Sequence, residues 1–91
     1  MRIEYKPSFK KKYKKLHNNQ LVDINAAINY IASDVAVGQL KKANLSGVRV
    51  YKFKMVNQLT LLAYRVEEDG GIVLLLLDFG SHENFYRDLK N

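Results

Sequence analysis

The stretch VRVYKFKMVNQLTLLAYRVEEDGGIVLLLLDF, residues 48–79, decides the fold because its side-chain pattern has a period of two. This period predicts β-strands. We expect three strands, at 48–56, 59–66 and 72–79, with turns at 57–58 and 67–71. The second turn contains Asp-Gly, a pair that tolerates positive φ angles. The third strand is apolar on both faces, which predicts a central, buried strand.

The first of these strands has two different faces. Tyr51, Phe53 and Met55 alternate with Lys52 and Lys54. Successive side chains of a strand point to opposite faces of the sheet. If the apolar three pack under helices, both lysines must lie on the open face.

Upstream, the chain predicts one short strand and two helices. Residues 1–6 alternate well enough for a strand, and Pro7 and Ser8 break it, with Ser8 as a helix N-cap. Apolar residues at 9, 13 and 16 then form one helical stripe, which HNN at 17–19 ends. A second stripe follows, and Gly38 interrupts it. Its members are Leu21, Ile24, Ala27, Ile28, Ile31 and Val35.

The two ends of the strand region predict a turn and a last helix. KKANLSG, residues 41–47, is typical of a turn. Gly80 is expected to end the third strand, and Ser81 to cap a final helix that carries Phe85 and Leu89 on one side. The element order is therefore β-α-α-β-β-β-α, an α+β fold. We expect a single domain, 1–91, in which an antiparallel helical hairpin covers one face of a small, largely antiparallel sheet.

Composition excludes several functional classes. The chain has 91 residues, no cysteine and only two histidines, far apart, so we expect neither a disulfide nor a metal site, and no cofactor. No apolar run approaches the roughly 18 residues that span a bilayer. The N-terminus lacks the pattern of a signal peptide. These features predict a soluble, cytoplasmic protein without a membrane partner.

The positive charge is concentrated at the N-terminus. The net charge is +6, and residues 1–15 carry seven basic residues and one acid, which already gives +6. Lys10, Lys11 and Lys14 on the first helix are candidates for RNA or phosphate contacts. A solvated helix face is the alternative reading of such a lysine run.

Three motifs carry a family resemblance: NLSGVRVYKFK, LLAYRV and GSHENFYRDL. Their placement within this order of elements resembles the RelE/ParE superfamily of bacterial toxins over essentially the whole chain. The closing GSHENFY is most similar to the YafQ branch. For the nuclease branches, the resemblance implies a ribosome-dependent, metal-independent endoribonuclease that cleaves messenger RNA in the A site. It also implies a cognate antitoxin that neutralises the toxin in a hetero-oligomer.

The resemblance also suggests the site residues. His82 matches the YafQ-branch histidine, and a histidine with an ordinary pKa of about 6.5 suits acid or base work near neutrality. Tyr86, one helical turn later, matches an aromatic that would stack on a base or donate a proton. Lys52 and Lys54 match a lysine pair that faces RNA. Asp78, four residues before His82, would either orient the imidazole or serve the turn.

The sequence also departs from the RelE pattern. Leu61 stands where RelE carries a catalytic arginine, and His82 stands where it carries another. Arg49, Arg65 and Arg87 are the remaining candidates for phosphate contacts. The departure leaves two alternatives open, a non-nucleolytic ParE-like poison of DNA gyrase and a degenerate module that only binds its antitoxin.

Overall fold

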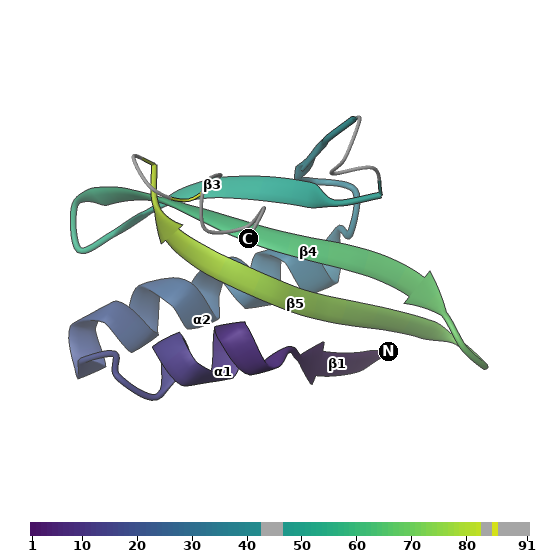
Figure 1. Cartoon of the computed structure of the whole chain (residues 1–91), viewed down its shortest axis with the longest axis horizontal. Coiled ribbons are helices and arrows are strands. Elements are labelled where there is room, and N and C mark those ends of the chain that lie inside the picture. The colour runs from purple at the N-terminus through teal and green to yellow at the C-terminus, as the bar shows by residue number, and fades with distance from the viewer. Residues whose placement is uncertain (43–46, 83–84, 86–91) are drawn as a thin grey trace.

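The computed structural model describes residues 1–42, 47–82 and 85. Two helices lie on one side of a five-stranded sheet (Figure 1). In chain order the elements are β1 (Arg2–Tyr5), α1 (Pro7–Tyr13), α2 (Asn18–Ser33), β2 (Gln39–Leu40), β3 (Arg49–Met55), β4 (Gln58–Glu68) and β5 (Ile72–Ser81).

The sheet has the strand order β1-β5-β4-β3-β2. All neighbouring strands are antiparallel except β1 and β5, which are parallel. The apolar β5 lies between β1 and β4, so the prediction that it is buried inside the sheet is confirmed, although β4 rather than β5 is the central strand. The α+β architecture with helices on one face is confirmed as well.

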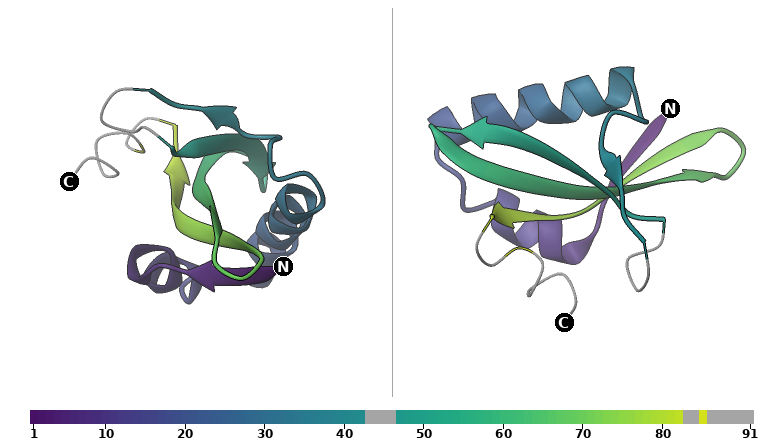
Figure 2. Two further views of the ribbon diagram at one scale, coloured as in Figure 1. Left: turned by 90° about the vertical axis from the view of Figure 1, so that its right-hand side faces the viewer. Right: turned by 90° about the horizontal axis from the view of Figure 1, so that it is seen from above.

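The sheet has a thick core on one face only. Under the helices, Phe9 of α1 and Ile24, Ile28 and Ile31 of α2 pack against Leu62, Tyr64, Leu74, Leu76 and Phe79 of β4 and β5. Tyr51, Phe53 and Met55 of β3 pack against this cluster, as their alternation predicted. Helix α1 contacts mainly β5 and α2 mainly β3, and α2 runs back along the sheet (Figure 2).

Both helix boundaries differ from those expected. Helix α1 begins at Pro7, with Lys6 rather than Ser8 at the N-cap, because proline has the φ angle of a first helical residue and needs no N–H partner there. It ends at Tyr13, so Leu16 lies beyond it. The HNN segment does not end α1. His17 is the N-cap of α2, where its N–H donates to the Gln20 side chain at 2.9 Å.

Strand β2 was not predicted, and a tyrosine holds the segment that leads to it. The Tyr64 hydroxyl accepts a hydrogen bond from the Gly38 N–H and donates one to the Val35 carbonyl, both at 2.8 Å. A Cβ atom on Gly38 would lie 2.7 Å from the Tyr64 ring, so only glycine fits. Helix α2 already ends at Ser33, so Val35 lies beyond it and Gly38 does not interrupt a helix, contrary to the prediction; glycine is required there because the chain passes close to a buried ring.

The β3–β4 turn lies one residue earlier than predicted. Val56 and Asn57 both have positive φ angles, 50° and 67°, and Gln58 already belongs to β4. Positive φ at both central positions is typical of the tightest hairpin turns, but valine is strained there. The Val56 N–H donates to the Asp23 carboxylate at 2.7 Å, which ties the turn to α2.

The end of β5 also differs from the prediction. The register shifts between Ala63 and Tyr64, so that Leu77 is an extra residue on β5. Gly80 does not end the strand, and Ser81 is its last residue rather than a helix cap. The expected final helix lies outside the described residues, apart from Phe85.

Replacing Tyr64 with Phe tests whether the two hydrogen bonds of the Tyr64 hydroxyl stabilise the segment between α2 and β2. The variant leaves the Gly38 N–H and the Val35 carbonyl without their partner, so the free energy of unfolding should fall by about 1–3 kcal/mol. Urea denaturation measures it, with Tyr30→Phe on the exposed face of α2 as the control. A Tyr64→Phe variant as stable as the control would show that these hydrogen bonds do not stabilise the fold.

The difference in stability between the wild type and Tyr64→Phe should also depend on pH. Burial raises the pKa of the Tyr64 phenol above its ordinary value of about 10. A raised pKa in the folded state stabilises the fold below the unfolded pKa, and this contribution is lost as the pH rises through the folded pKa. The stability difference between wild type and Tyr64→Phe should therefore shrink above about pH 10.

Replacing Val56 with Asn should relieve the strain in the turn. Asparagine tolerates a positive φ far better than a β-branched residue and keeps the N–H that Asp23 accepts, so the free energy of unfolding should rise by about 0.5–1 kcal/mol. Thermal and urea unfolding measure the change. Val22→Asn, at an exposed position of α2, should shift stability by less than about 0.5 kcal/mol. Destabilisation by Val56→Asn would show that the turn is not strained.

Candidate functional site

The face of the sheet opposite the helices carries both candidate lysines. Lys52 and Lys54 are exposed there, as the alternation of β3 predicted. The register pairs Lys52 with Leu61 of β4, and Leu61 with Gly80 of β5. These three residues therefore form one row across the sheet.

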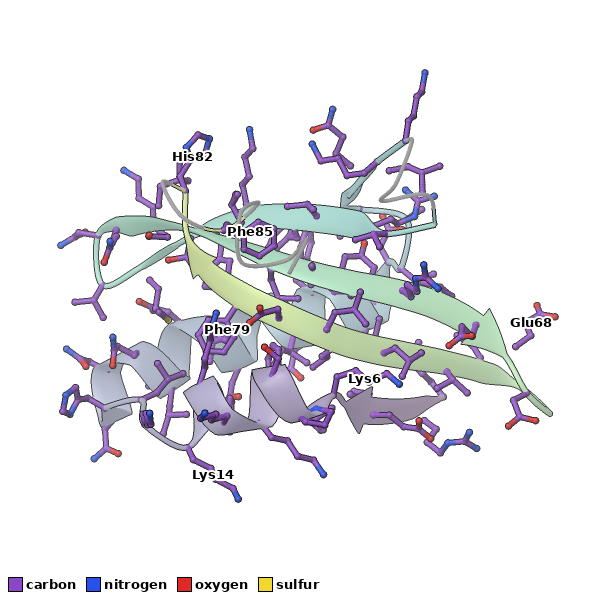
Figure 3. All side chains as sticks on the ribbon, viewed as in Figure 1. Lys6, Lys14, Glu68, Phe79, His82 and Phe85 are labelled. Carbon is purple, nitrogen blue, oxygen red and sulfur yellow. The ribbon has the colours of Figure 1, made fainter. Side chains whose placement is uncertain are left out.

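The neighbouring row connects the second lysine to the histidine. Lys54 pairs with Leu59, and Thr60 pairs with Ser81, the last residue of β5, which His82 follows directly in a turn. Strands are spaced about 4.8 Å apart, so β3 and β5 are roughly 10 Å apart at this end of the sheet, with β4 between them. Figure 3 shows His82 at the end of β5, pointing away from the helices.

The floor between these polar groups is apolar. Leu61 is fully buried and clusters with Val48, Val50, Ala63 and Phe85. Phe85 thus covers the sheet on the side opposite the helices. The position where the family resemblance expects a catalytic arginine is therefore part of a second, smaller hydrophobic core.

The lysines of α1 lie away from this face. Lys10, Lys11 and Lys14 are exposed. Lys10 and Lys14 line a hollow of about 320 Å³, together with Tyr5 and Tyr13. The hollow belongs to the α1–β1 side of the molecule. The structure therefore does not bring the α1 lysines together with His82.

The two strand arginines have different positions. One guanidinium nitrogen of Arg49 donates to the carbonyls of Ala36 and Gly38, at 3.3 and 2.9 Å, so Arg49 holds the segment before β2 rather than the open face. The prediction of a phosphate contact at Arg49 is not supported by this geometry. Arg65 is exposed on the open face, but it lies four residues along β4 from Leu61, about 13 Å away.

Asp78 has other partners than His82. Its Oδ1 accepts hydrogen bonds from the Lys12 ammonium at 2.9 Å and from the Phe79 N–H at 2.8 Å. Lys12 also donates to the Phe79 carbonyl at 3.0 Å. The carboxylate therefore anchors the end of β5 to α1, a role that neither of the two sequence-based alternatives included.

Lys12 is the residue that the sequence reasoning missed. It was counted in the basic segment but not singled out. It follows the buried Phe9 by three residues, and residues at this spacing share a side of a helix. This spacing was the available signal that Lys12, unlike its neighbours, faces the sheet.

The last two candidate residues are not described, and two further features concern metal binding and membrane spanning. Tyr86 and Arg87 lie outside the described residues. Within residues 1–42, 47–82 and 85, no three histidine or acidic side chains converge to hold a metal ion. No helix in the described part of the chain is long and apolar enough to cross a membrane.

Among the described residues, the open face offers two ammonium groups at the end of β3 and one imidazole just beyond β5. Two cations on one strand, about 7 Å apart, can hold phosphate oxygens. An imidazole across one strand from them can take or give a proton. The arrangement suits a phosphodiester lying across the ends of β3, β4 and β5.

Comparisons with known proteins agree with this fold. A chain of the intact E. coli RelBE toxin–antitoxin complex superposes with a TM-score of 0.67 at 16% identity, over 88% of this chain and 94% of that chain. A mutant of E. coli toxin RelE in the free state gives 0.69 at 15% identity, over 98% of this chain and 88% of that chain. At these identities the likeness shows the fold alone.

Sequence comparison identifies the family. No curated protein matches the chain. A family model described as the ParE-like toxin of type II bacterial toxin–antitoxin systems matches residues 3–90. Because this match spans nearly the whole chain, the protein belongs to the ParE-like toxins of type II bacterial toxin–antitoxin systems.

Proposed function

We propose that this toxin is an endoribonuclease that cleaves messenger RNA on the ribosome and so inhibits translation. The observation that supports the proposal is that Lys52 and Lys54 are exposed on the open face of β3, while His82 follows β5 at the same end of the sheet. Gyrase poisoning would not require an imidazole beside two cations. The RelE fold of the structural neighbours is consistent with the proposal.

The proposed reaction is attack of a 2′-hydroxyl on the adjacent phosphate. The 2′-oxygen–phosphorus bond forms, the bond to the 5′-oxygen breaks, and the products are a 2′,3′-cyclic phosphate and a 5′-hydroxyl. Lys52 and Lys54 stabilise the negative charge that develops on the phosphorane. His82 acts as general acid or base, and Tyr86 stacks on a base or assists proton transfer.

The site holds few catalytic groups, which favours a substrate aligned by a larger partner. Only the ribosome would hold the message in the required geometry, so free RNA is expected to be a poor substrate. The exposed Lys10, Lys11 and Lys14 would contact ribosomal RNA on the other side of the molecule. A cognate antitoxin would bind the toxin and neutralise it, as partner in a hetero-oligomer.

One observation favours the non-nucleolytic alternative. Leu61 is buried against Phe85 where the resemblance expects an arginine, so the described part of the chain supplies no arginine at this position. A ParE-like poison of DNA gyrase, or a module that only binds its antitoxin, would not need one. The same experiment separates all three functions.

Replacing His82 with Ala should abolish cleavage. Loss of a positioned proton-transfer group lowers a rate by about 10²–10⁴-fold. Wild type and variant are induced in cells, and the ends of messenger RNA are mapped. His17→Ala removes the only other histidine, at the exposed start of α2, and should cleave as the wild type does.

The other outcomes identify the alternatives. Growth arrest with intact messages and altered DNA supercoiling would contradict the nuclease proposal and support a gyrase poison. Intact messages without growth arrest, together with tight binding to a small partner protein, would indicate a module that only binds its antitoxin.

A further inference from the structure

A second hollow lies at the same end of the sheet, next to α1, and Phe85 from the open side also lines it. It has a volume of about 260 Å³ and extends between α1 and the ends of β3, β4 and β5. Its lining combines three apolar side chains, Met55, Phe79 and Phe85, with Lys12 and the polar residues Gln58, Thr60 and Ser81, beside Gly80. Nothing in the proposed cleavage chemistry uses it.

The hollow is one residue away from the candidate catalytic group. Thr60 and Ser81 are paired across β4 and β5 and lie on the helix side. His82 follows Ser81 directly, just beyond the end of β5, and its side chain points away from the helices (Figure 3). If one nucleotide of an RNA lies at His82, the neighbouring nucleotide can therefore reach the hollow around the end of β5.

The charge in the hollow does not suit an anion. Lys12 is its cationic residue, and its ammonium is 2.9 Å from the Asp78 carboxylate, which is nearly buried. A close ion pair cancels most of the field that would attract a phosphate. Apolar walls with a few polar groups are instead typical of sites for uncharged, ring-shaped ligands.

The hydrogen-bonding groups suggest which ring would fit. An ammonium has three N–H donors, and within the described part of the chain the Lys12 ammonium has two oxygen partners, Asp78 and Phe79. One donor is left for a ligand. The Thr60 hydroxyl donates to the Gln58 carbonyl at 3.0 Å, so its oxygen can still accept.

We propose that this hollow binds one nucleobase, preferentially guanine, of the RNA that lies at His82. Guanine presents O6 and N7 as acceptors, which suits the remaining Lys12 donor, whereas adenine places an N6 amino donor beside N7. The N–H groups of guanine would donate to the Thr60 hydroxyl. This inference rests on the proposed RNA-cleaving function for the origin of the base, but the binding site itself is tested without cleavage.

The test is titration of ¹⁵N-labelled toxin with GMP, AMP and ribose 5-phosphate, followed by NMR. GMP should shift the amides of Thr60, Phe79, Gly80 and Ser81, and AMP should bind about tenfold more weakly, as expected for one lost pair of base contacts. Ribose 5-phosphate, which carries the phosphate without a base, should leave these amides unshifted.

Variants assign the effect to the hollow. Thr60→Val should weaken GMP binding about fivefold to tenfold. Lys12→Met combined with Asp78→Asn should abolish the base preference without leaving a buried carboxylate unpaired. Lys15→Met removes the same charge from an exposed position outside the hollow and should bind GMP as the wild type does. The dispersion of each spectrum reports whether the variant is folded.

Two results would overturn the proposal. Equal shifts with GMP, AMP and ribose 5-phosphate would mean that only the phosphate binds, and an absence of shifts at the four amides would mean that the hollow binds no base. These results are distinct from failure of the proposed function. Message cleavage without GMP binding rejects the hollow alone, and GMP binding without message cleavage rejects the nuclease alone.

Discussion

The pairing register of β4 with β3 and β5 is the constraint on which the site depends. Because side chains alternate along a strand, a slip of one residue would move every side chain of β4 to the other face. The register is held by burial on both sides, with Leu62 and Tyr64 under the helices and Leu61 and Ala63 in the smaller cluster. The positions of Lys52, Lys54 and His82 follow from it.

The same sheet end also contains the groups that hold it in place. The ion pair of Lys12 and Asp78 joins α1 to the last residues of β5, beyond the part of that strand that β1 pairs with. Asp23 of α2 holds the turn that begins β4. Each helix thus fixes one of the strand ends that carry the candidate site. A rigid frame of this kind suits a site with few catalytic groups.

Much of the architecture could be predicted because it depends on local periodicity. The period of two in residues 48–79 identified the strands and the face of each lysine, and the apolar run identified the internal strand. The short β2, the bulge at Leu77 and the turn at Val56 could not be predicted, because tertiary contacts override local preference there. The Tyr64 hydroxyl, for example, holds the segment before β2 from 26 residues away.

The site could be predicted only in part. The lysine pair and His82 came from alternation and from the family resemblance; the register places the lysines on the open face, and His82 follows β5 at the same end of the sheet. The sequence could not show that Arg49 donates hydrogen bonds to backbone carbonyls or that Asp78 binds Lys12. Both contacts depend on which loop or helix packs beside the strand. Leu61 was recognised as a departure from RelE, and its burial explains why an apolar residue fits there.

The claim that the two lysines and the histidine form one RNA-cleaving site is tested most directly by a double-mutant cycle. Purified wild type, Lys54→Ala, His82→Ala and the double variant are compared in single-turnover cleavage of a message on programmed ribosomes. Residues that act as a unit lose activity non-additively, so the double variant should lose much less than the product of the two single losses. Fully multiplicative losses, or a wild type that leaves the message intact, would contradict the account.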